Sequence, residues 1–392
     1  MSTNHKLRIG IIGLGAAGAG MFPAITMHPG IELAGAADID SILRKNFARD
    51  HKLEVDESAA ALVRRDAIDA VYIATPHQYH CDHTILALEH GKHVIVEKPM
   101  SLSLQECDRM IDAAERHGKV MIVGHSHSFD APIRVMREII ASGELGRVAM
   151  IAMFNYTDFL YRPRREEELD TERGGGILFN QIPHQVDTAR LLVGEPVRSV
   201  RAVAGILDPT RRTEGSCMAF LDFEGGATAS LVYSGYDHFD SDEFHGWIGE
   251  RGQPKRANHG AARRSLGKLI GAGAEEEARR KRYGYGLAAP AAIPADIDHH
   301  QPHFGTVIVS CAHGDMRPSA DGVMVYADDG AREIPIDIGA GLAGRDQLLD
   351  ELCNAVFKGI APVHNGRFAR GTVETALAIL RSSRERREVR LK

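Results

Sequence analysis

The feature that most constrains this chain is a glycine-rich turn close to its start. An apolar run, Leu7 to Ile12, breaks into Gly13-Leu-Gly-Ala-Ala-Gly18 and continues as an Ala-rich stretch. This pattern predicts a buried parallel strand that ends near Ile12 and a helix that begins near Ala16. In such a turn the first glycine permits the reversal, the second lets a pyrophosphate approach the backbone, and the third allows close packing of helix on strand. The helix N-terminus favours phosphate, so the predicted contacts are Gly13, Gly15, Ala16, Ala17 and Gly18.

Asp38 follows the next apolar run, Ile31 to Ala37. A carboxylate there can accept hydrogen bonds from both ribose hydroxyls of NAD, and it would repel the 2′-phosphate of NADP. Ile39 comes next, with no arginine to hold such a phosphate, so the sequence favours NAD. The alternative is that Asp38 caps the following helix.

Strands and helices alternate through the first 125 residues. Short runs rich in Val, Ile and Ala at 31–37, 70–74, 93–96 and 120–123 are typical of strands buried on both faces. The clearest helix is 103–117, with a capping box formed by Ser103 and Glu106 and a stop at Gly118. These βα units predict a doubly wound parallel sheet, a Rossmann domain that binds NAD over residues 1–125.

Residues 126–392 are predicted to form a second, α+β domain for substrate binding and oligomerisation. Its strands are expected at 147–157, 197–206, 216–223, 227–234, 305–312, 322–327 and 331–336, and its helices at 132–141, 177–193, 345–358 and 367–383. Turns at 224–226 and 328–330 indicate hairpins of an open, mostly antiparallel sheet, whose uncovered face is a candidate surface for a homodimer or homotetramer. An insert at about 237–302 contains a charged, helix-like stretch from Arg263 to Arg282, which is either a solvated helix or a lid or subunit-crossing arm.

Composition limits the classes of partner. A net charge of −6 gives no electrostatic reason to bind nucleic acid or anionic membrane. No apolar run reaches membrane-spanning length, and the first residues lack the basic region of a signal peptide. The five cysteines are scattered without a Cys-x-x-Cys pair, which fits a reducing compartment. We therefore expect a cytoplasmic protein with a small-molecule substrate.

Two clusters follow predicted strands of the first domain, at the strand ends where ligands bind. Thr75-Pro76-His-Gln-Tyr-His80 follows the run at 70–74, and Glu97-Lys98-Pro99 follows the run at 93–96. Lys98 can donate a hydrogen bond to a substrate hydroxyl, although the bland alternative is a Glu–Lys ion pair at a surface turn. His77, His80 and His83 recur every third residue, but no carboxylate or cysteine set completes a cage, so no metal is expected.

A third cluster, Gly174 to Asp187, joins three glycines to a polar stripe. If a helix begins near Ile177, then Asn180, His184 and Asp187 share one face. A histidine titrates near neutral pH, so His184 is suited to take a proton. The alternative for His184 is a hydrogen-bonded core histidine.

Together these motifs resemble the Gfo/Idh/MocA family of oxidoreductases. The resemblance rests on the turn at 13–18, on Thr75-Pro76 with His80, on Glu97-Lys98-Pro99, on Gly124-His125, and on Gly174-Gly-Gly176 through His184 and Asp187. It implies a Rossmann domain plus an open-sheet domain, with Lys98 holding the reacting hydroxyl and His184 as general base. The implied cofactor contacts beyond the turn are Asp38, Thr75, Pro76, His80, Glu97 and Lys98. Many members carry aspartate where this chain has Asn180, so Asn180 either orients the imidazole or binds substrate.

Within the family the chain resembles the phthalate cis-4,5-dihydrodiol dehydrogenases, through the segments 158–165, 176–181 and 238–245. A phthalate diol carries two carboxylates, which Arg162, Arg164 and Arg165 can pair with. The alternative is that Glu166–Glu168 neutralise these arginines. His125 and His127 are expected to face the same cleft, with Asp187 as a further substrate contact.

The expected activity is therefore NAD-dependent oxidation of an aromatic cis-dihydrodiol. Two alternatives stay open. One is a dehydrogenase of sugars, glycosides or inositols. The other is a protein that senses NAD without catalysis, against which the intact Glu97-Lys98-Pro99 and His184 argue.

Overall fold

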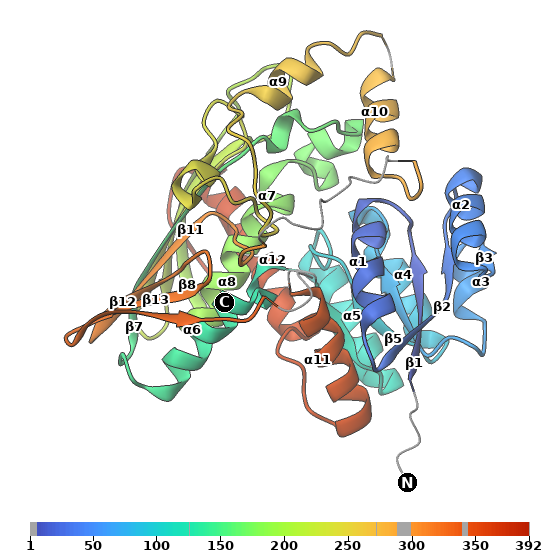
Figure 1. Cartoon of the computed structure of the whole chain (residues 1–392), viewed down its shortest axis with the longest axis horizontal. Coiled ribbons are helices and arrows are strands. Elements are labelled where there is room, and N and C mark those ends of the chain that lie inside the picture. Colours follow the sequence, from blue (N-terminus) through green and yellow to red (C-terminus); the bar gives the residue numbers. More distant parts are fainter. Residues whose placement is uncertain (1–5, 125, 272, 288–298, 339–343, 392) are drawn as a thin grey trace. The chain divides into compact units, whose positions relative to one another are not determined.

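The computed structural model describes residues 6–124, 126–271, 273–287, 299–338 and 344–391, and the chain divides into two compact units (Figure 1). Unit 1 holds the described residues within Met1–His125, Glu276–Ala292 and Arg345–Val373. Unit 2 holds those within Ser126–Glu275, Ile293–Gly344 and Glu374–Lys392. Two later segments of the chain, one of them from the insert, thus cluster with the N-terminal residues.

Unit 1 contains a six-stranded parallel sheet in the order β3-β2-β1-β4-β5-β6. Its strands are β1 (Leu7–Ile12), β2 (Ile31–Ala37), β3 (Val55–Asp56), β4 (Ala70–Ile73), β5 (His93–Val96) and β6 (Met121–Val123). Its helices are α1 (Ala16–Met27), α2 (Ser41–His51), α3 (Ala59–Val63), α4 (His80–Glu89), α5 (Leu104–His117) and α11 (Arg345–Lys358). The predicted doubly wound sheet is confirmed. Its order reverses between β1 and β4, which is where such sheets bind ligands.

Local signals set the helix ends. The Ser103 hydroxyl accepts a hydrogen bond from the Glu106 N–H at 3.2 Å, and Gly118 ends α5 in the left-handed conformation, with φ of 59°. The apolar side of α5, including Met110, is buried. The predicted helix over 103–117 is therefore confirmed.

Unit 2 contains a nine-stranded sheet in the order β14-β13-β12-β11-β7-β10-β9-β8-β15, antiparallel except for the pair β7–β10. Its strands are β7 (Val148–Tyr156), β8 (Val197–Gly205), β9 (Ser216–Phe223), β10 (Thr228–Ser234), β11 (Thr306–Cys311), β12 (Gly314–Pro318), β13 (Gly322–Ala327), β14 (Gly330–Pro335) and β15 (Val389–Arg390). The predicted strands and both hairpins are confirmed. β12 and β15 were not predicted, because one is polar and ends in proline and the other is two residues long.

Helices pack on one face of this sheet. α6 (Ala131–Ser142) contacts β12 and β13, and α8 (Ile182–Val193) contacts β7 and β10. The strand residues that alternate with the buried ones point to the other face of the sheet and include exposed apolar side chains, among them Met150, Val203, Met218, Phe220 and Ile308. Unit 2 therefore carries an apolar sheet face that no helix covers among the described residues. α12 (Gly366–Glu385) begins in unit 1 and ends in unit 2.

Two predicted helices are each broken in two. The helix expected over 177–193 is α7 (Gly176–Asn180) followed by α8, with Gln181 between them at φ −118° and ψ −48°. Pro183 lacks the N–H that a continuous helix would donate to the Phe179 carbonyl, and its ring would crowd that carbonyl, so one regular helix cannot run through this position. The charged stretch Arg263–Arg282 lies in α9 (Ala261–Leu266) and α10 (Ala274–Tyr283), separated by Gly271 and Gly273, both with positive φ.

Candidate active site

The three glycines of the N-terminal turn have different surroundings. Gly13 has φ of 99°, and a Cβ there would lie 2.7 Å from the Ala74 carbonyl oxygen. A Cβ on Gly18 would overlap the carbonyl oxygen of Gly13. A Cβ on Gly15 would meet nothing within 4 Å. The first and third glycines are therefore required by the fold, whereas the second borders the open cradle that a pyrophosphate needs.

Asp38 lies at the carboxyl end of β2 and faces this turn. Its carboxylate accepts hydrogen bonds from the Leu14 N–H at 2.6 Å and from the Asp40 N–H at 2.7 Å. The cap of α2 is Asp40, which accepts from the N–H groups of Ile42 and Leu43. The alternative that Asp38 is the helix cap is therefore wrong, and its position suits a ribose.

His80 ties together the turns after β4 and β5. It is fully buried, with Nδ1 2.8 Å from the Pro99 carbonyl oxygen and Nε2 2.9 Å from that of Thr75. Burial lowers the pKa of His80, and its hydrogen bonds to these carbonyls oppose that shift. The geometry gives His80 a positioning role for Thr75-Pro76 and Lys98-Pro99.

Glu97 is held by a tyrosine that the sequence analysis missed. The hydroxyl of Tyr72, fully buried on β4, donates to the Glu97 carboxylate, which also accepts from the Lys98 N–H at 3.2 Å. Burial and the nearby carboxylate raise the pKa of Tyr72 well above its usual value. Glu97 is thus fixed from the strand beneath it, and Lys98 follows it half-buried at the end of β5.

In unit 2, His184 lies on α8 within a group of rings. It is 7% exposed, its Nδ1 lies 3.4 Å from the Ser126 hydroxyl, and its ring centroid lies 4.9 Å from that of His127 and 4.8 Å from that of Phe304. Tyr233 stacks near Phe304, with centroids 6.0 Å apart. The structure therefore brings two of the predicted site histidines, His127 and His184, together.

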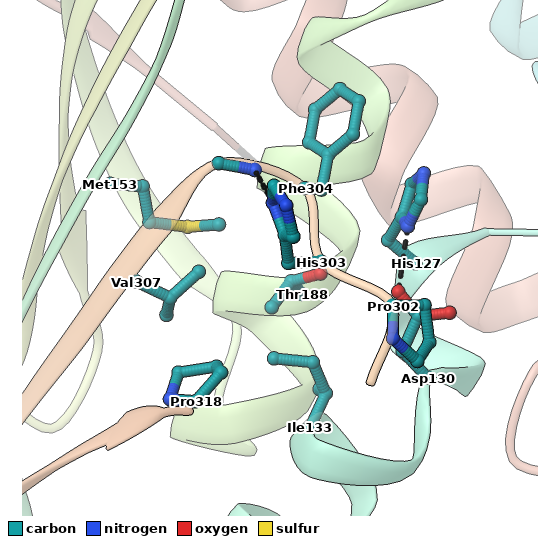
Figure 2. Close-up of a pocket in the computed structure, with 11 residues that line it drawn as sticks. His127, Asp130, Ile133, Met153, Thr188, Pro302, His303, Phe304, Val307 and Pro318 are labelled. Carbon is teal, nitrogen blue, oxygen red and sulfur yellow. Dashed lines mark hydrogen bonds and ion pairs between the residues drawn. The ribbon is translucent and has the colours of Figure 1, made fainter. Parts of the chain in front are cut away.

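His127 is paired with a buried carboxylate (Figure 2). Its Nδ1 lies 2.7 Å from the Asp130 carboxylate, which is 1% exposed, and its ring stacks on Phe304 at 4.6 Å. With Nδ1–H directed at a carboxylate, the neutral ring presents Nε2 as an acceptor. These residues border a pocket lined by His127, Asp130, Ile133, Met153, Thr188, Pro302, His303, Phe304, Gly305, Val307 and Pro318.

Asn180 is placed differently from the prediction, whereas Asp187 lies on the same helix as His184. Because the helix breaks at Gln181, Asn180 does not share a continuous helix face with His184; its amide donates to the carbonyls of Gly174 and Gly176 at 3.2 and 2.8 Å. Asp187 does share α8 with His184, and it accepts a hydrogen bond from Ser128 at 2.5 Å. Asn180 therefore holds the glycine turn, and Asp187 holds the segment that carries His127.

The three predicted arginines lie beside carboxylates of their own unit. The Arg162 guanidinium is 2.7 Å from Asp158, that of Arg164 is 3.6 Å from Glu168, and that of Arg165 is 3.2 Å from Glu167. Arg164 also donates to the Phe159 carbonyl and lies 3.8 Å over its ring. Arg164 and Arg165 therefore pair with acids of the segment Glu166–Glu168, as the alternative interpretation of this segment predicts.

The remaining predictions concern His125 and a metal. His125 lies outside the described residues. Among the residues that the structure describes, no group of three or more His, Cys, Asp or Glu side chains is arranged to hold a metal ion. In the described part of the chain, no helix combines the length and apolar character needed to cross a membrane.

Sequence reasoning missed Asp130, Phe304 and Tyr72. The spacing of Asp130, three residues after His127, is a signal that was available. Phe304 and Tyr72 meet the site only through long-range packing, for which local spacing carries no signal.

Family models match both units. A model described as the oxidoreductase family with an NAD-binding Rossmann fold matches residues 7–125, and a model of the Gfo/Idh/MocA C-terminal domain matches residues 133–253. A 1-carboxy-3-chloro-3,4-dihydroxycyclohexa-1,5-diene dehydrogenase of Comamonas testosteroni is 40% identical over 385 residues, covering 95% of this chain and 94% of that protein. The chain belongs to the Gfo/Idh/MocA family of oxidoreductases.

Two further relatives are similar to this chain. The crystal structure of a putative dehydrogenase from Bordetella bronchiseptica RB50 is 47% identical, with a TM-score of 0.93, and the match covers 98% of this chain and all of that one. A more distant relative is scyllo-inositol 2-dehydrogenase (NAD(+)) of Bacillus subtilis, which is 29% identical over 59% of this chain and 68% of that protein. This chain is therefore an NAD-dependent oxidoreductase. The open cradle at Gly15 and the carboxylate of Asp38 fit that cofactor.

Proposed function

We propose that this oxidoreductase converts a carboxylated cis-dihydroxycyclohexadiene to the corresponding catechol. The observation that carries the proposal is the 40% identity, over nearly the full length of both chains, to a dehydrogenase named for a carboxylated dihydroxycyclohexadiene. In its finer form the substrate is phthalate 4,5-cis-dihydrodiol and the product is 4,5-dihydroxyphthalate.

Two residues are proposed to act on the carbinol. NAD, when bound, accepts the hydride from the carbinol carbon. His184 takes the proton from the hydroxyl, and Lys98 donates a hydrogen bond to the same oxygen. The ketone so formed loses its neighbouring ring C–H as a proton and gains one on oxygen, which gives the catechol. The net change is one hydride to NAD and one proton released, and aromatisation makes the reverse reaction unfavourable.

His127 is proposed to bind the second hydroxyl. Asp130 accepts a hydrogen bond from Nδ1, so Nε2 is an acceptor when the ring carries one proton. A substrate hydroxyl can donate that hydrogen bond. Asn180 supports the site by holding the turn of Gly174 and Gly176, and Asp187 supports it by holding Ser128.

The substrate carboxylates are proposed to be held by the segment 162–165. Arg162 and Arg165 form ion pairs with half-buried acids, which a substrate carboxylate can replace. Arg164 has the contacts of a structural residue, because it packs on Phe159 and donates to its carbonyl. Among these arginines, Arg162 and Arg165 are therefore the candidates for specificity.

We also propose that a second copy of the chain covers the open face of the unit 2 sheet. That face exposes several large apolar side chains, such as Met218 and Phe220 at alternate positions of β9 and Val203 opposite Met218 on β8. All five cysteines are free thiols, which fits a cytoplasmic setting.

The test is a panel of substrates, with the absorbance of NADH as the measure of turnover. Cis-dihydrodiols with no, one and two ring carboxylates are compared with scyllo-inositol, each with NAD and with NADP. We expect kcat/KM for the carboxylated diols to exceed that for the others by at least about tenfold, since an ion pair lost from a substrate costs about 1.4 kcal/mol or more. Preference for inositol, or turnover independent of the carboxylates, would contradict the proposal.

The residue roles are tested by substitution. Lys98→Ala and His184→Ala are each expected to lower kcat by roughly 10²- to 10⁴-fold, the usual contribution of general acid–base groups. His90→Ala, at an exposed histidine that caps the C-terminus of α4, is the matched control and is expected to keep full activity. Near-normal turnover by either Lys98→Ala or His184→Ala would remove that residue from the mechanism.

A further inference from the structure

One segment of the insert belongs to the nucleotide-binding unit. Residues 276–287, here named the strap, comprise most of α10 and the four residues after it, and they cluster with unit 1. The rest of the described insert clusters with unit 2. From the sequence, this stretch is either a solvated helix or a lid or subunit-crossing arm, so the contacts of the strap within unit 1 need an explanation.

The strap is bonded to the phosphate-binding turn. The Tyr285 N–H donates to the Leu14 carbonyl at 3.1 Å. Leu14 stands between Gly13 and Gly15, and its own N–H donates to Asp38. The strap is therefore attached to the residue that links the open cradle at Gly15 to the ribose-facing carboxylate.

Tyr285 anchors the strap to α1, which leaves that turn, and to α2, which follows β2. Its ring lies 5.0 Å from Phe47, 5.6 Å from His51 and 6.1 Å from Phe22 between centroids, and its hydroxyl is hydrogen-bonded to His51. The Tyr285 carbonyl also accepts from the Asn46 amide at 3.4 Å. Such an aromatic cluster, spread over α1 and α2, is more than a solvated charged helix requires.

Arg280 provides a second attachment, at the loop that follows Asp38. Its guanidinium lies 2.9 Å from the Asp40 carboxylate, and Arg44 of α2 donates to the carbonyls of Asp38 and Ile39 at 2.8 and 3.0 Å. Neither arginine adjoins Asp38 in sequence. The loop 38–40 is therefore held by one cation from α2 and one from the strap.

We propose that the strap is the outer wall of the NAD site at its adenosine end, where it fixes Leu14 and the loop 38–40 in the conformation that receives the ribose. Both attachments act on residues that flank Gly15 and Asp38, and neither involves the nicotinamide end. The inference rests on the NAD cofactor and not on the identity of the substrate.

The experiment measures binding of ADP-ribose to the full-length protein by calorimetry. Because ADP-ribose lacks the nicotinamide and needs no substrate, a failed dihydrodiol assay leaves this readout intact. We expect Tyr285→Ala to weaken ADP-ribose binding by about tenfold or more, through loss of the aromatic anchor. We expect Arg280→Gln and Asp40→Asn to weaken it by roughly two- to fivefold, as loss of a half-exposed ion pair does. Asparagine caps helices as well as aspartate, so Asp40→Asn leaves the start of α2 intact.

Lys268→Ala is the control, since Lys268 is an exposed residue of the same insert outside the strap. It is expected to bind ADP-ribose as the wild type does. If Tyr285→Ala fails to fold, Arg280→Gln and Asp40→Asn carry the test. ADP-ribose affinities equal to that of the wild type in all folded strap variants would overturn the proposal and leave the strap an ordinary surface element.

Discussion

Substitutions at the glycines of the N-terminal turn can distinguish a glycine that NAD binding requires from one that the fold requires. Gly15→Ala adds a methyl group that meets no protein atom within 4 Å, at a residue with φ of −77° that any L-residue adopts. Removing a glycine stabilises a chain by about 0.4–1 kcal/mol through the unfolded state. Alanine is a poorer helix cap than glycine by a similar amount, and Gly15 caps α1. The two effects offset each other, so the free energy of unfolding should stay within about 1 kcal/mol of the wild type.

The same methyl group occupies the place where a pyrophosphate must approach the backbone. Forcing an extra methyl into a filled contact costs about 1–3 kcal/mol, so NADH should bind roughly 5- to 150-fold more weakly. Gly18→Ala should behave in the opposite way, because its Cβ would overlap the Gly13 carbonyl, a backbone atom that cannot move aside. It should lower the free energy of unfolding by about 1–3 kcal/mol or more.

Two assays on the same preparations decide the matter: urea unfolding for stability, and NADH fluorescence titration for affinity. Wild-type affinity in a stable Gly15→Ala variant would refute the reasoning, because it would show that no phosphate lies against Gly15. A loss of stability in Gly15→Ala would also contradict it, since no described atom is close enough to clash.

Three further predictions concern assembly, thiols and pH. Phe220→Lys places a charge at a 49% exposed position on the open sheet face and should lower the apparent mass in light scattering. Lys268→Ala should leave the mass unchanged. An unchanged mass of the Phe220→Lys variant would exclude this face as the subunit contact. Burial raises the pKa of the Cys217 thiol to about 12, so it should resist alkylation at pH 8 until the protein is unfolded, and rapid labelling of the native protein would contradict this. Burial lowers the pKa of His93 to about 4, and its Nδ1 accepts a hydrogen bond from the Val120 N–H. As the pH falls, the unfolded chain therefore binds a proton at this histidine before the folded chain does. The stability that this difference contributes is complete above about pH 6.5 and is lost as the pH falls toward 4, so His93→Asn should flatten that decline in acid unfolding curves.

Much of the fold could be predicted because its signals are local. Short apolar runs located β2 and β5 to the residue, and Ser103 and Gly118 bounded α5. The turn at Gly13 likewise predicted where β1 ends and α1 begins. Periodicity and capping depend on near neighbours in sequence, so they can be read without coordinates.

The parts that could not be predicted depend on contacts between distant residues. The ring of Phe304 reaches His127 and His184 across more than a hundred residues, and Arg280 reaches Asp40 across 240. The break at Gln181 differs, because its signal is local: Pro183 removes a backbone hydrogen bond to the preceding turn of the helix. The pairing of Arg164 with Glu168 was present as an alternative, and only the geometry decided it.

The most direct test of the proposed reaction follows the hydrogen itself. A carboxylated cis-dihydrodiol labelled with deuterium at its carbinol carbons is turned over with NAD, and mass spectrometry measures the label in the NADH and the amount of catechol. The mechanism predicts one deuterium in every NADH and one catechol for each NADH, with none of the transferred label derived from solvent. Catechol formed without NADH, or NADH that carries hydrogen from water, would contradict hydride transfer from the carbinol.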